Sequence, residues 1–353
     1  MSPKIKRILA AAVLIVLLHA FVINPIAAVA VYESIFGERF ETEPYFAHSP
    51  SDFEGLCCER SDFSSDGVTL AGYKYSIDAT APRGVVVMAH GYGGGGHNAY
   101  MPFAYEFARA GYSVFAYDAR GNDNSGGKSV GGLVRGVIDL DNALMHVKSA
   151  PEYEGLPIML FGHSWGAYSA GSVMALHTDI AACVMVAGFN ESEDMIAYES
   201  KGVVGPLASL TLPYVYLYES LKFGKKYSSL SALSGTSATD ALVMVVQSMD
   251  DISVPPECGF DKLYAAYSEN ERFTFITYGD RGHDRILYSR EAEEYRAQLN
   301  LAYTEYVEAR GGEYSAEIKA EFMSLYLDKS ACFEPDGELI GKMIDMFDRA
   351  SDR

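Results

Sequence analysis

Residues 157–166 read PIMLFGHSWG, and this stretch decides the architecture predicted for the whole chain. Its first five residues form a short apolar run, typical of a strand buried inside a parallel sheet. Ser164 then stands between Gly162 and Gly166, and residues 165–177 have the length of a helix. A strand, a serine between two glycines and a helix predict a sharp turn with the serine at its tip. The glycines are needed because a Cβ at either position would collide with neighbouring backbone.

The strand signature of this stretch recurs along the chain. Short, continuous apolar runs occupy residues 84–89, 112–117, 180–187, 241–246 and 273–278, and residues 68–77 alternate like a pair of strands. Helix-length segments lie between them, at residues 101–110, 133–149, 165–177 and 257–268. This βαβα order predicts an α/β fold with a mostly parallel central sheet and helices on both faces.

One interval, residues 190–235, is longer than a crossover helix requires, and we interpret it as a helical cap inserted over the edge of the sheet. The resulting division assigns residues 1–32 to an N-terminal membrane anchor or signal segment, 33–62 to a linker and 63–353 to the α/β domain. Within that domain the core is residues 63–189 and 236–310, the cap is 190–235, and a C-terminal helical extension is 311–353.

The N-terminus carries a membrane signal. Lys4, Lys6 and Arg7 precede an apolar segment that continues, with one interruption, over residues 8–32. We expect the basic residues to stay cytoplasmic and the segment to form a single-pass membrane anchor, which places the α/β domain outside the cytoplasm. The small residues 28–30 leave an alternative, secretion after signal cleavage, but a signal peptide usually has an apolar region of only about 7–15 residues.

Charge and cysteine content exclude several function classes. The formal net charge is −19 and the acids are spread along the chain, so nucleic acid is not an expected partner. The five cysteines and eight histidines show no metal-site spacing, and we expect neither a metal nor an organic cofactor. The adjacent Cys57 and Cys58 could be oxidised outside the cell.

A glycine-rich loop follows the predicted strand at residues 84–89. It reads HGYGGGG over residues 90–96, and no Lys-Ser/Thr pair of a phosphate-binding loop follows it. Such a loop lets backbone N–H groups approach a reacting oxygen closely. We predict that the N–H groups of Tyr92 and Trp165 form an oxyanion hole.

An acid and a base follow the serine in chain order. Asp250 and Asp251 end one of the last two predicted strands, and His283 follows the other. A hydroxyl needs an imidazole to take its proton and a carboxylate to orient that imidazole, which makes His283 the candidate base. His90 and His163 lie within glycine motifs and are interpreted as structural. The residues alone leave Asp250 and Asp251 as alternatives for the acid.

Residues 63–283 resemble the α/β-hydrolase superfamily, and within it the group of monoglyceride lipases and serine aminopeptidases. The resemblance rests on HGYGGG with Tyr100, FARAGYSVFAYDARGNDNSGG, GHSWG and SMDDISVP. It implies a catalytic triad of Ser164, Asp251 and His283, because members place the acid four residues before the proline. One family pattern, Asp-x-Arg-Gly-x-Gly-x-Ser, departs here: residues 118–121 keep it, but Asn-Asp-Asn replaces the usual glycine at 122–124.

The expected activity is that of a serine hydrolase that cleaves carboxylic esters, with a monoacylglycerol- or lysophospholipid-like substrate. The first alternative is a serine aminopeptidase of the proline-releasing type, in which acids at the start of the cap bind a free amino group; the candidates are Glu191, Glu193, Asp194 and Glu199. The second alternative is a catalytically silent, membrane-tethered binding protein on the same fold.

Overall fold

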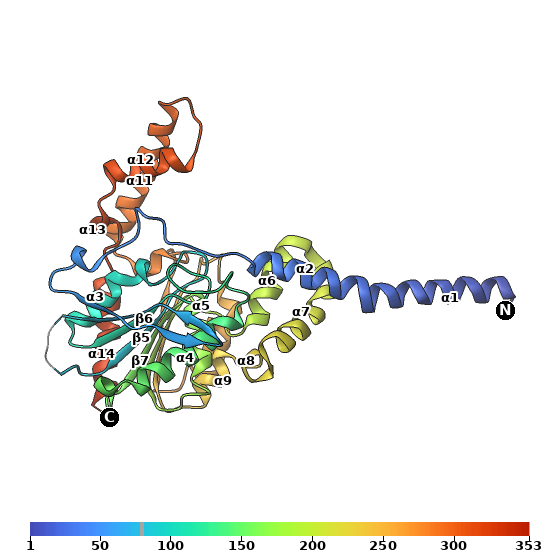
Figure 1. Ribbon diagram of the computed structural model, residues 1–353, viewed down its shortest axis with the longest axis horizontal. Coiled ribbons are helices and arrows are strands. Elements are labelled where there is room, and N and C mark those ends of the chain that lie inside the picture. The colour runs from blue at the N-terminus through green and yellow to red at the C-terminus, as the bar shows by residue number, and fades with distance from the viewer. Residues whose placement is uncertain (78–80, 353) are drawn as a thin grey trace.

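An eight-stranded sheet lies at the centre of the structure, a computed structural model that describes residues 1–77 and 81–352 (Figure 1). The strand order is β1-β4-β6-β5-β7-β8-β9-β10; β4 pairs antiparallel with both β1 and β6, and every pair from β6 to β10 is parallel. Its strands are β1 Cys57–Arg60, β4 Gly72–Ser76, β5 Val85–Ala89, β6 Ser113–Tyr117, β7 Ile158–His163, β8 Ile180–Val186, β9 Leu242–Ser248 and β10 Phe273–Tyr278. A separate hairpin joins β2 Phe63–Ser65 and β3 Val68–Leu70. The predicted α/β fold with a mainly parallel sheet is confirmed.

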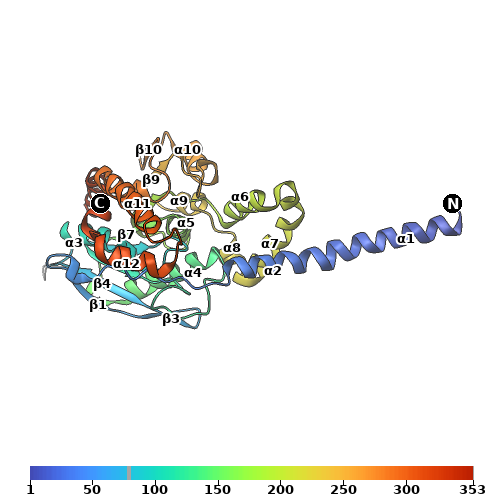
Figure 2. The same ribbon diagram turned by 90° about the horizontal axis from the view of Figure 1, so that it is seen from above.

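Alternation along β5 divides the core into two layers. Val85, Val87 and Ala89 face one layer, with helices α4 and α5, while Val86 and Met88 face the other, with α3 and α14. Because both faces are covered, the strand is apolar throughout instead of alternating with polar residues. Figure 2 shows β1 and β10 at opposite ends of the sheet.

The α-helices of the described residues cover the sheet, form the cap or extend from the body. They are α1 Pro3–Leu18, α2 Asn24–Phe36, α3 Met101–Arg109, α4 Val134–Ser149, α5 Trp165–Val173, α6 Ser192–Val204, α7 Ala208–Phe223, α8 Lys225–Ser228, α9 Ala232–Ser237, α10 Phe260–Tyr267, α11 Arg290–Glu308, α12 Ala316–Tyr326, α13 Lys329–Cys332 and α14 Gly337–Ser351. Helices α6 to α9 lie between β8 and β9, in the interval where the cap is expected.

The N-terminal helix has two different halves. A π-helical turn at His19–Ile23 joins α1 to α2, so that one apolar helix runs over Pro3–Phe36 with a mean hydropathy of 2.4 in its most apolar window. No residue of α1 is buried, and Figure 1 shows it extending away from the body. In α2, by contrast, Ala28, Tyr32 and Phe36 are buried on one face, where α2 packs against α7 of the cap. The second half of the helix is therefore part of the folded domain.

Residues 33–62, expected to form a linker, contain a strand of the central sheet. Cys57–Arg60 form β1, which pairs antiparallel with β4 at the sheet edge. All four side chains are exposed, so this strand lacks the apolar pattern by which strands are recognised in a sequence. The thiols of Cys57 and Cys58 are both exposed and free.

The C-terminal region is helical, as the sequence pattern beyond residue 286 indicates. Helices α11 and α12 form an arm that projects from the body in Figure 1, and α14 returns to pack against the sheet. Gly311 and Gly312 turn the chain between α11 and α12 with φ of +103° and +79°, a conformation that glycine adopts readily.

Candidate active site

Ser164 lies at the tip of a sharp turn between β7 and α5. Its backbone has φ +57° and ψ −119°, an unfavourable conformation for a residue with a side chain. A Cβ at Gly162 would overlap the Gly166 carbonyl, and one at Gly166 would overlap the Ala89 carbonyl of the neighbouring strand. Because both glycines allow this close packing, the turn holds the serine side chain at the carboxyl edge of the sheet.

Three residues from three strand ends meet at this edge. Ser164 follows β7, Asp251 follows β9 and His283 follows β10, so parallel strands bring together positions that are 119 and 32 residues apart in sequence. The distance from His283 Nε2 to Ser164 Oγ is 2.9 Å, and that from His283 Nδ1 to the Asp251 carboxylate is 2.7 Å. The structure therefore places the three predicted side chains in one hydrogen-bonded series.

Backbone hydrogen bonds fix the Asp251 carboxylate independently of His283. It is only 3% exposed, and its Oδ1 accepts hydrogen bonds from the N–H groups of Ser253 and Val254, both at 2.9 Å. Its Oδ2 is left to accept from His283 Nδ1. An anion held in this way keeps the imidazole in one orientation and leaves Nε2 facing the serine.

Asp250, the sequence alternative, points elsewhere. Its side chain is 41% exposed and accepts from the Ser248 hydroxyl at 2.6 Å and the Gly282 N–H at 2.8 Å. These hydrogen bonds, with that from Ser248 the stronger influence, lower the pKa of Asp250. Asp250 thus ties the end of β9 to the loop that carries His283 and does not contact the imidazole.

The two expected oxyanion donors are neighbours. Tyr92 follows β5, and Trp165 is the first residue of α5, with its ring centroid 5.8 Å from that of Tyr92. The preceding Gly91 N–H donates to the Tyr100 hydroxyl at 3.0 Å. Among the described residues, no hydrogen-bond acceptor is found for the N–H of Tyr92 or Trp165. Both groups are thus unengaged next to Ser164.

Comparisons with known proteins bear on the fold and family. A family profile described as "Serine aminopeptidase, S33" matches residues 80–249. Two structures of an esterase from Pyrococcus furiosus superimpose on 77% and 81% of this chain and 99% of theirs, with TM-scores of 0.52 and 0.54 at 20% and 18% identity. These likenesses show that the chain has an α/β-hydrolase fold. A monoacylglycerol lipase of Mycolicibacterium smegmatis is 37% identical over 111 residues, which make up 30% of this chain and 39% of the relative.

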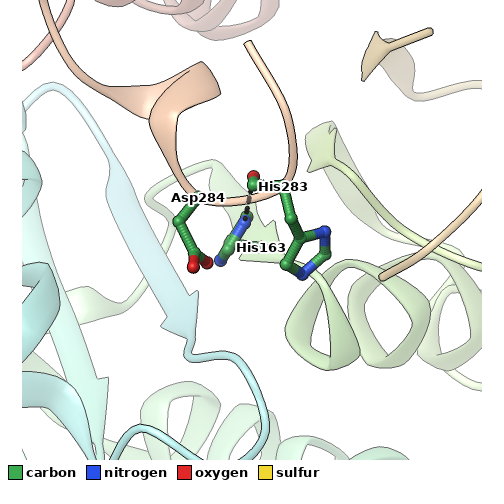
Figure 3. A group of neighbouring side chains, drawn as sticks. All are labelled: His163, His283 and Asp284. Atoms are coloured by element: carbon green, nitrogen blue, oxygen red, sulfur yellow. Dashed lines mark hydrogen bonds between the residues drawn. The ribbon is translucent and has the colours of Figure 1, made fainter. Parts of the chain in front are cut away.

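His163, which precedes Ser164 in the chain, connects two loops around the site. Figure 3 shows its ring reaching the backbone oxygen of His283, at 3.3 Å from Nε2. A carbonyl only accepts, so Nε2 carries the hydrogen, and Nδ1 accepts from the Tyr100 hydroxyl at 2.8 Å. Burial, and secondly the charge of His283, lowers the pKa of His163 to about 4. His163 is therefore neutral at neutral pH, and its two hydrogen bonds join Tyr100 to the loop of His283.

His163, His283 and Asp284 form a group whose potential metal-ligand atoms lie within 4.8 Å of one another (Figure 3). Both ring nitrogens of each histidine already have hydrogen-bond partners: Tyr100 and the His283 carbonyl for one, Asp251 and Ser164 for the other. A metal ion would have to break these bonds, so the donor set fits proton transfer better than metal binding.

Sequence reasoning overlooked Gln247. Its amide Nε2 donates to the Asp251 carboxylate at 3.3 Å and to the Val254 carbonyl at 3.1 Å, beneath the acid of the site. Gln247 is 1% exposed in a strand that is otherwise almost entirely apolar. A polar residue in a buried strand needs hydrogen-bond partners, which is the signal that could have identified it.

Arg281 is a second residue that sequence reasoning overlooked, and it anchors the loop of the candidate base. The guanidinium is almost fully buried and forms ion pairs with Glu293 and Asp336. Its backbone N–H donates to the Ser248 hydroxyl at 2.9 Å. These contacts hold the loop of His283 against both β9 and the C-terminal helices.

Proposed function

We propose that this α/β-hydrolase is a serine hydrolase that cleaves carboxylic esters through an acyl-enzyme on Ser164. The observation that carries the proposal is the continuous hydrogen-bonded series of Ser164, His283 and Asp251, with distances of 2.9 and 2.7 Å. It lies beside two unengaged backbone N–H groups. A nucleophile, an oriented base and oxyanion donors are the three groups that acyl transfer requires.

In the first half-reaction Ser164 Oγ attacks the ester carbonyl carbon. His283 takes the hydroxyl proton on Nε2, since its Nδ1–H donates to the Asp251 carboxylate. The carbonyl oxygen becomes an oxyanion, which accepts hydrogen bonds from the N–H groups of Tyr92 and Trp165. His283 then gives its proton to the departing alcohol, and the acyl group stays on the serine.

The second half-reaction restores the enzyme. Water donates a proton to His283 Nε2 while its oxygen attacks the acyl carbon, and the same two N–H groups stabilise the second oxyanion. The bond from the acyl carbon to Ser164 Oγ then breaks, the serine recovers its proton from His283, and the carboxylic acid leaves. These side chains serve every proton transfer, so the reaction requires no metal or organic cofactor.

An acyl lipid, such as a monoacylglycerol or lysophospholipid-like molecule, is the proposed substrate class. The long apolar N-terminal helix and the cap against which it packs support this choice, because they bring the site close to a source of lipid. The partial match to a protein named monoacylglycerol lipase also supports it.

We propose further that the N-terminal helix is an uncleaved, single-pass anchor with the catalytic domain outside the cytoplasm. Lys4, Lys6 and Arg7 favour a cytoplasmic N-terminus. The small residues 28–30 lie inside α2, with Ala28 buried against the cap, and a peptidase needs accessible backbone there. The intact mass of membrane-extracted protein should include residues 1–30; a chain that begins near residue 31 would overturn the anchor.

The aminopeptidase alternative needs free acids at the start of the cap. Lys262 Nζ lies 2.6 Å from both oxygens of Asp194 and 4.0 Å from Glu191. Burial, and secondly the charge of Asp194, raises the pKa of Glu191 and Glu193. The Lys262 ammonium thus already pairs with part of the acidic cluster, and this favours the esterase over a site for a substrate ammonium.

Turnover of two substrate series tests the choice. Purified protein is assayed with p-nitrophenyl esters of increasing acyl length and with proline p-nitroanilide, alongside Ser164→Ala as the matched inactive control. We expect ester hydrolysis that Ser164→Ala abolishes and negligible anilide hydrolysis. Anilide turnover without ester turnover would favour the aminopeptidase, and no turnover by folded protein would favour the silent binding protein.

A further inference from the structure

The last residues of α2 and the chain that follows them contact the glycine-rich loop that carries Tyr92. We call residues 35–42 the N-terminal strap and residues 91–96 the oxyanion loop. The strap runs beside residues 121–131: the Phe40 N–H donates to a carbonyl of this loop at 3.0 Å, and the Phe40 carbonyl accepts from the Asp123 N–H at 3.0 Å. The guanidinium of Arg39 donates to three more carbonyls within residues 121–131. Backbone and side-chain bonds therefore fix the strap in place.

The strap holds the Tyr92 end of the oxyanion loop through aromatic contacts. The ring centroids of Phe36 and Phe40 lie 5.9 and 5.0 Å from that of Tyr92, with the rings edge to face. The Tyr92 hydroxyl donates to the Ile35 carbonyl at 3.2 Å. The side chain of Tyr92 is thus enclosed between the strap and Trp165, whose ring it also meets edge to face.

Asp123 holds the C-terminal end of the oxyanion loop, at Gly96. One carboxylate oxygen accepts from the Thr42 N–H at 2.6 Å, and the other accepts from the Thr42 hydroxyl at 2.7 Å and the Gly96 N–H at 2.9 Å. A Cβ at Gly95 would overlap Thr42, so the loop and the strap are in close contact here. One carboxylate therefore joins the strap to the end of the glycine-rich loop.

Asp123 stands where the family pattern Asp-x-Arg-Gly-x-Gly-x-Ser has its second glycine. Its φ is +33°, a conformation that favours glycine over residues with a side chain. The chain thus keeps a strained backbone at a position that glycine would occupy without strain. The carboxylate that replaces the glycine makes the bonds to Thr42 and Gly96, and strain retained for such contacts suggests a function.

We propose that Asp123 and Thr42 are positioning residues that hold the oxyanion loop, residues 91–96, in its catalytic geometry, and that the N-terminal strap thereby couples the apolar helix to the active site. This inference rests on the proposed ester hydrolysis. The Tyr92 N–H must aim at an oxygen that is charged only in the transition state, so a loosened loop lowers kcat and leaves KM nearly unchanged.

Two variants remove the contact in different ways. Asp123→Gly deletes the carboxylate, which costs the three hydrogen bonds to Thr42 and Gly96, but relieves the strained backbone; a merely structural role predicts a change in stability alone, with unchanged kcat. We expect its kcat to fall about tenfold, less than the 10²–10³-fold loss of a whole oxyanion donor, with KM within about twofold. Thr42→Val removes the hydroxyl at constant shape and should lower kcat about threefold, whereas Thr42→Ser should retain the parent kcat.

Hydrogen exchange at the amides of residues 91–96 in the full chain provides a readout independent of turnover. We expect faster exchange in Asp123→Gly and Thr42→Val, and parent-like exchange in Thr42→Ser and in the control Asp328→Asn, whose carboxylate caps α13. Unchanged exchange rates in Asp123→Gly and Thr42→Val would contradict the proposal that the strap orders residues 91–96. Faster exchange with an unchanged kcat would contradict the role of the strap in catalysis. If the parent protein hydrolyses no ester, both the proposed function and the catalytic role of the strap are refuted. The exchange data would still decide whether the strap orders residues 91–96.

Discussion

The carboxyl edge of the sheet and the contact between α2 and the cap are built on different principles. At the edge, Asp251 is fixed by backbone N–H groups and the serine turn by glycine packing, so strands of one sheet set the geometry. Between α2 and α7, one stripe of buried residues and the buried carboxylate of Glu219 hold two helices together. The sheet edge thus positions Ser164, Asp251 and His283, whereas the helix contact holds α2 against the cap.

The largest effect should come from the nucleophile and its base. Ser164→Ala and His283→Ala should each lower kcat by roughly 10⁵–10⁶, because either change removes the whole nucleophilic pathway. Steady-state kinetics on a p-nitrophenyl ester, with folding checked by circular dichroism, measures the loss. If either folded variant kept more than about one-hundredth of the parent rate, the sheet edge would not hold the catalytic centre.

Substitutions of the two adjacent aspartates test whether Asp251, and not Asp250, orients His283. Asp251→Asn should lower kcat by about 10⁴, because an amide cannot fix the imidazole tautomer that leaves Nε2 free to accept a proton. Asp250→Asn, the matched control, should lower kcat by less than about tenfold, because Asp250 accepts hydrogen bonds from Ser248 and Gly282 and none from His283. Equal losses in both variants would show that loop order, and not the contact between Asp251 and His283, governs the rate.

Two glycine-to-alanine variants compare a tightly packed position with an open one. Gly166→Ala would drive a Cβ into the Ala89 carbonyl and should destabilise the protein by about 3 kcal/mol or more. Gly341→Ala, in α14 with nothing close to the new Cβ, should stabilise it by about 0.5–1 kcal/mol. Urea denaturation measures both values. A stable Gly166→Ala would contradict the close approach of α5 to β5.

The smallest effect concerns the helix contact. Glu219 is 2% exposed and accepts from the hydroxyls of Tyr32 and Ser192, and burial raises the pKa of its carboxyl. The folded state then binds more protons than the unfolded state, so stability should fall as pH rises from about 4.3 through the raised pKa, and then level off. Glu219→Gln does not titrate and should lose this part of the decline.

Melting temperatures from pH 4 to pH 8 measure that difference. The difference in melting temperature between Glu219→Gln and the parent should widen as the pH rises, because only the parent carboxyl titrates. Glu338→Gln is the control, because that side chain is 80% exposed in a helix surface pair. Parallel curves for the parent and Glu219→Gln would contradict a buried, titrating contact between α2 and the cap.

The sequence identified the sheet edge well because its signals are local and periodic. Buried strands are apolar, the serine turn has glycines at fixed spacing, and chain order assigns the base. Composition could not separate Asp250 from Asp251, since neighbouring residues after a strand point in different directions; the family resemblance favoured Asp251, the residue that the structure places beside His283.

The strap and β1 could not be predicted in the same way. Residues 35–42 contact other loops through carbonyls and ring edges, and such contacts leave no periodic pattern in either partner. The strand Cys57–Arg60 exposes all four side chains, so nothing apolar marks it. The replacement of glycine by Asp123 was visible in the sequence, but its partners Thr42 and Gly96 lie 81 and 27 residues away.

The central claim is that the imidazole of His283 activates the hydroxyl of Ser164. Labelling with a fluorophosphonate, followed by peptide mass spectrometry, tests it most directly. The account predicts one adduct per chain, located on the peptide with Ser164, and a rate at least about 10³-fold lower in His283→Ala. An adduct on another residue, or an equal labelling rate without the imidazole, would contradict it.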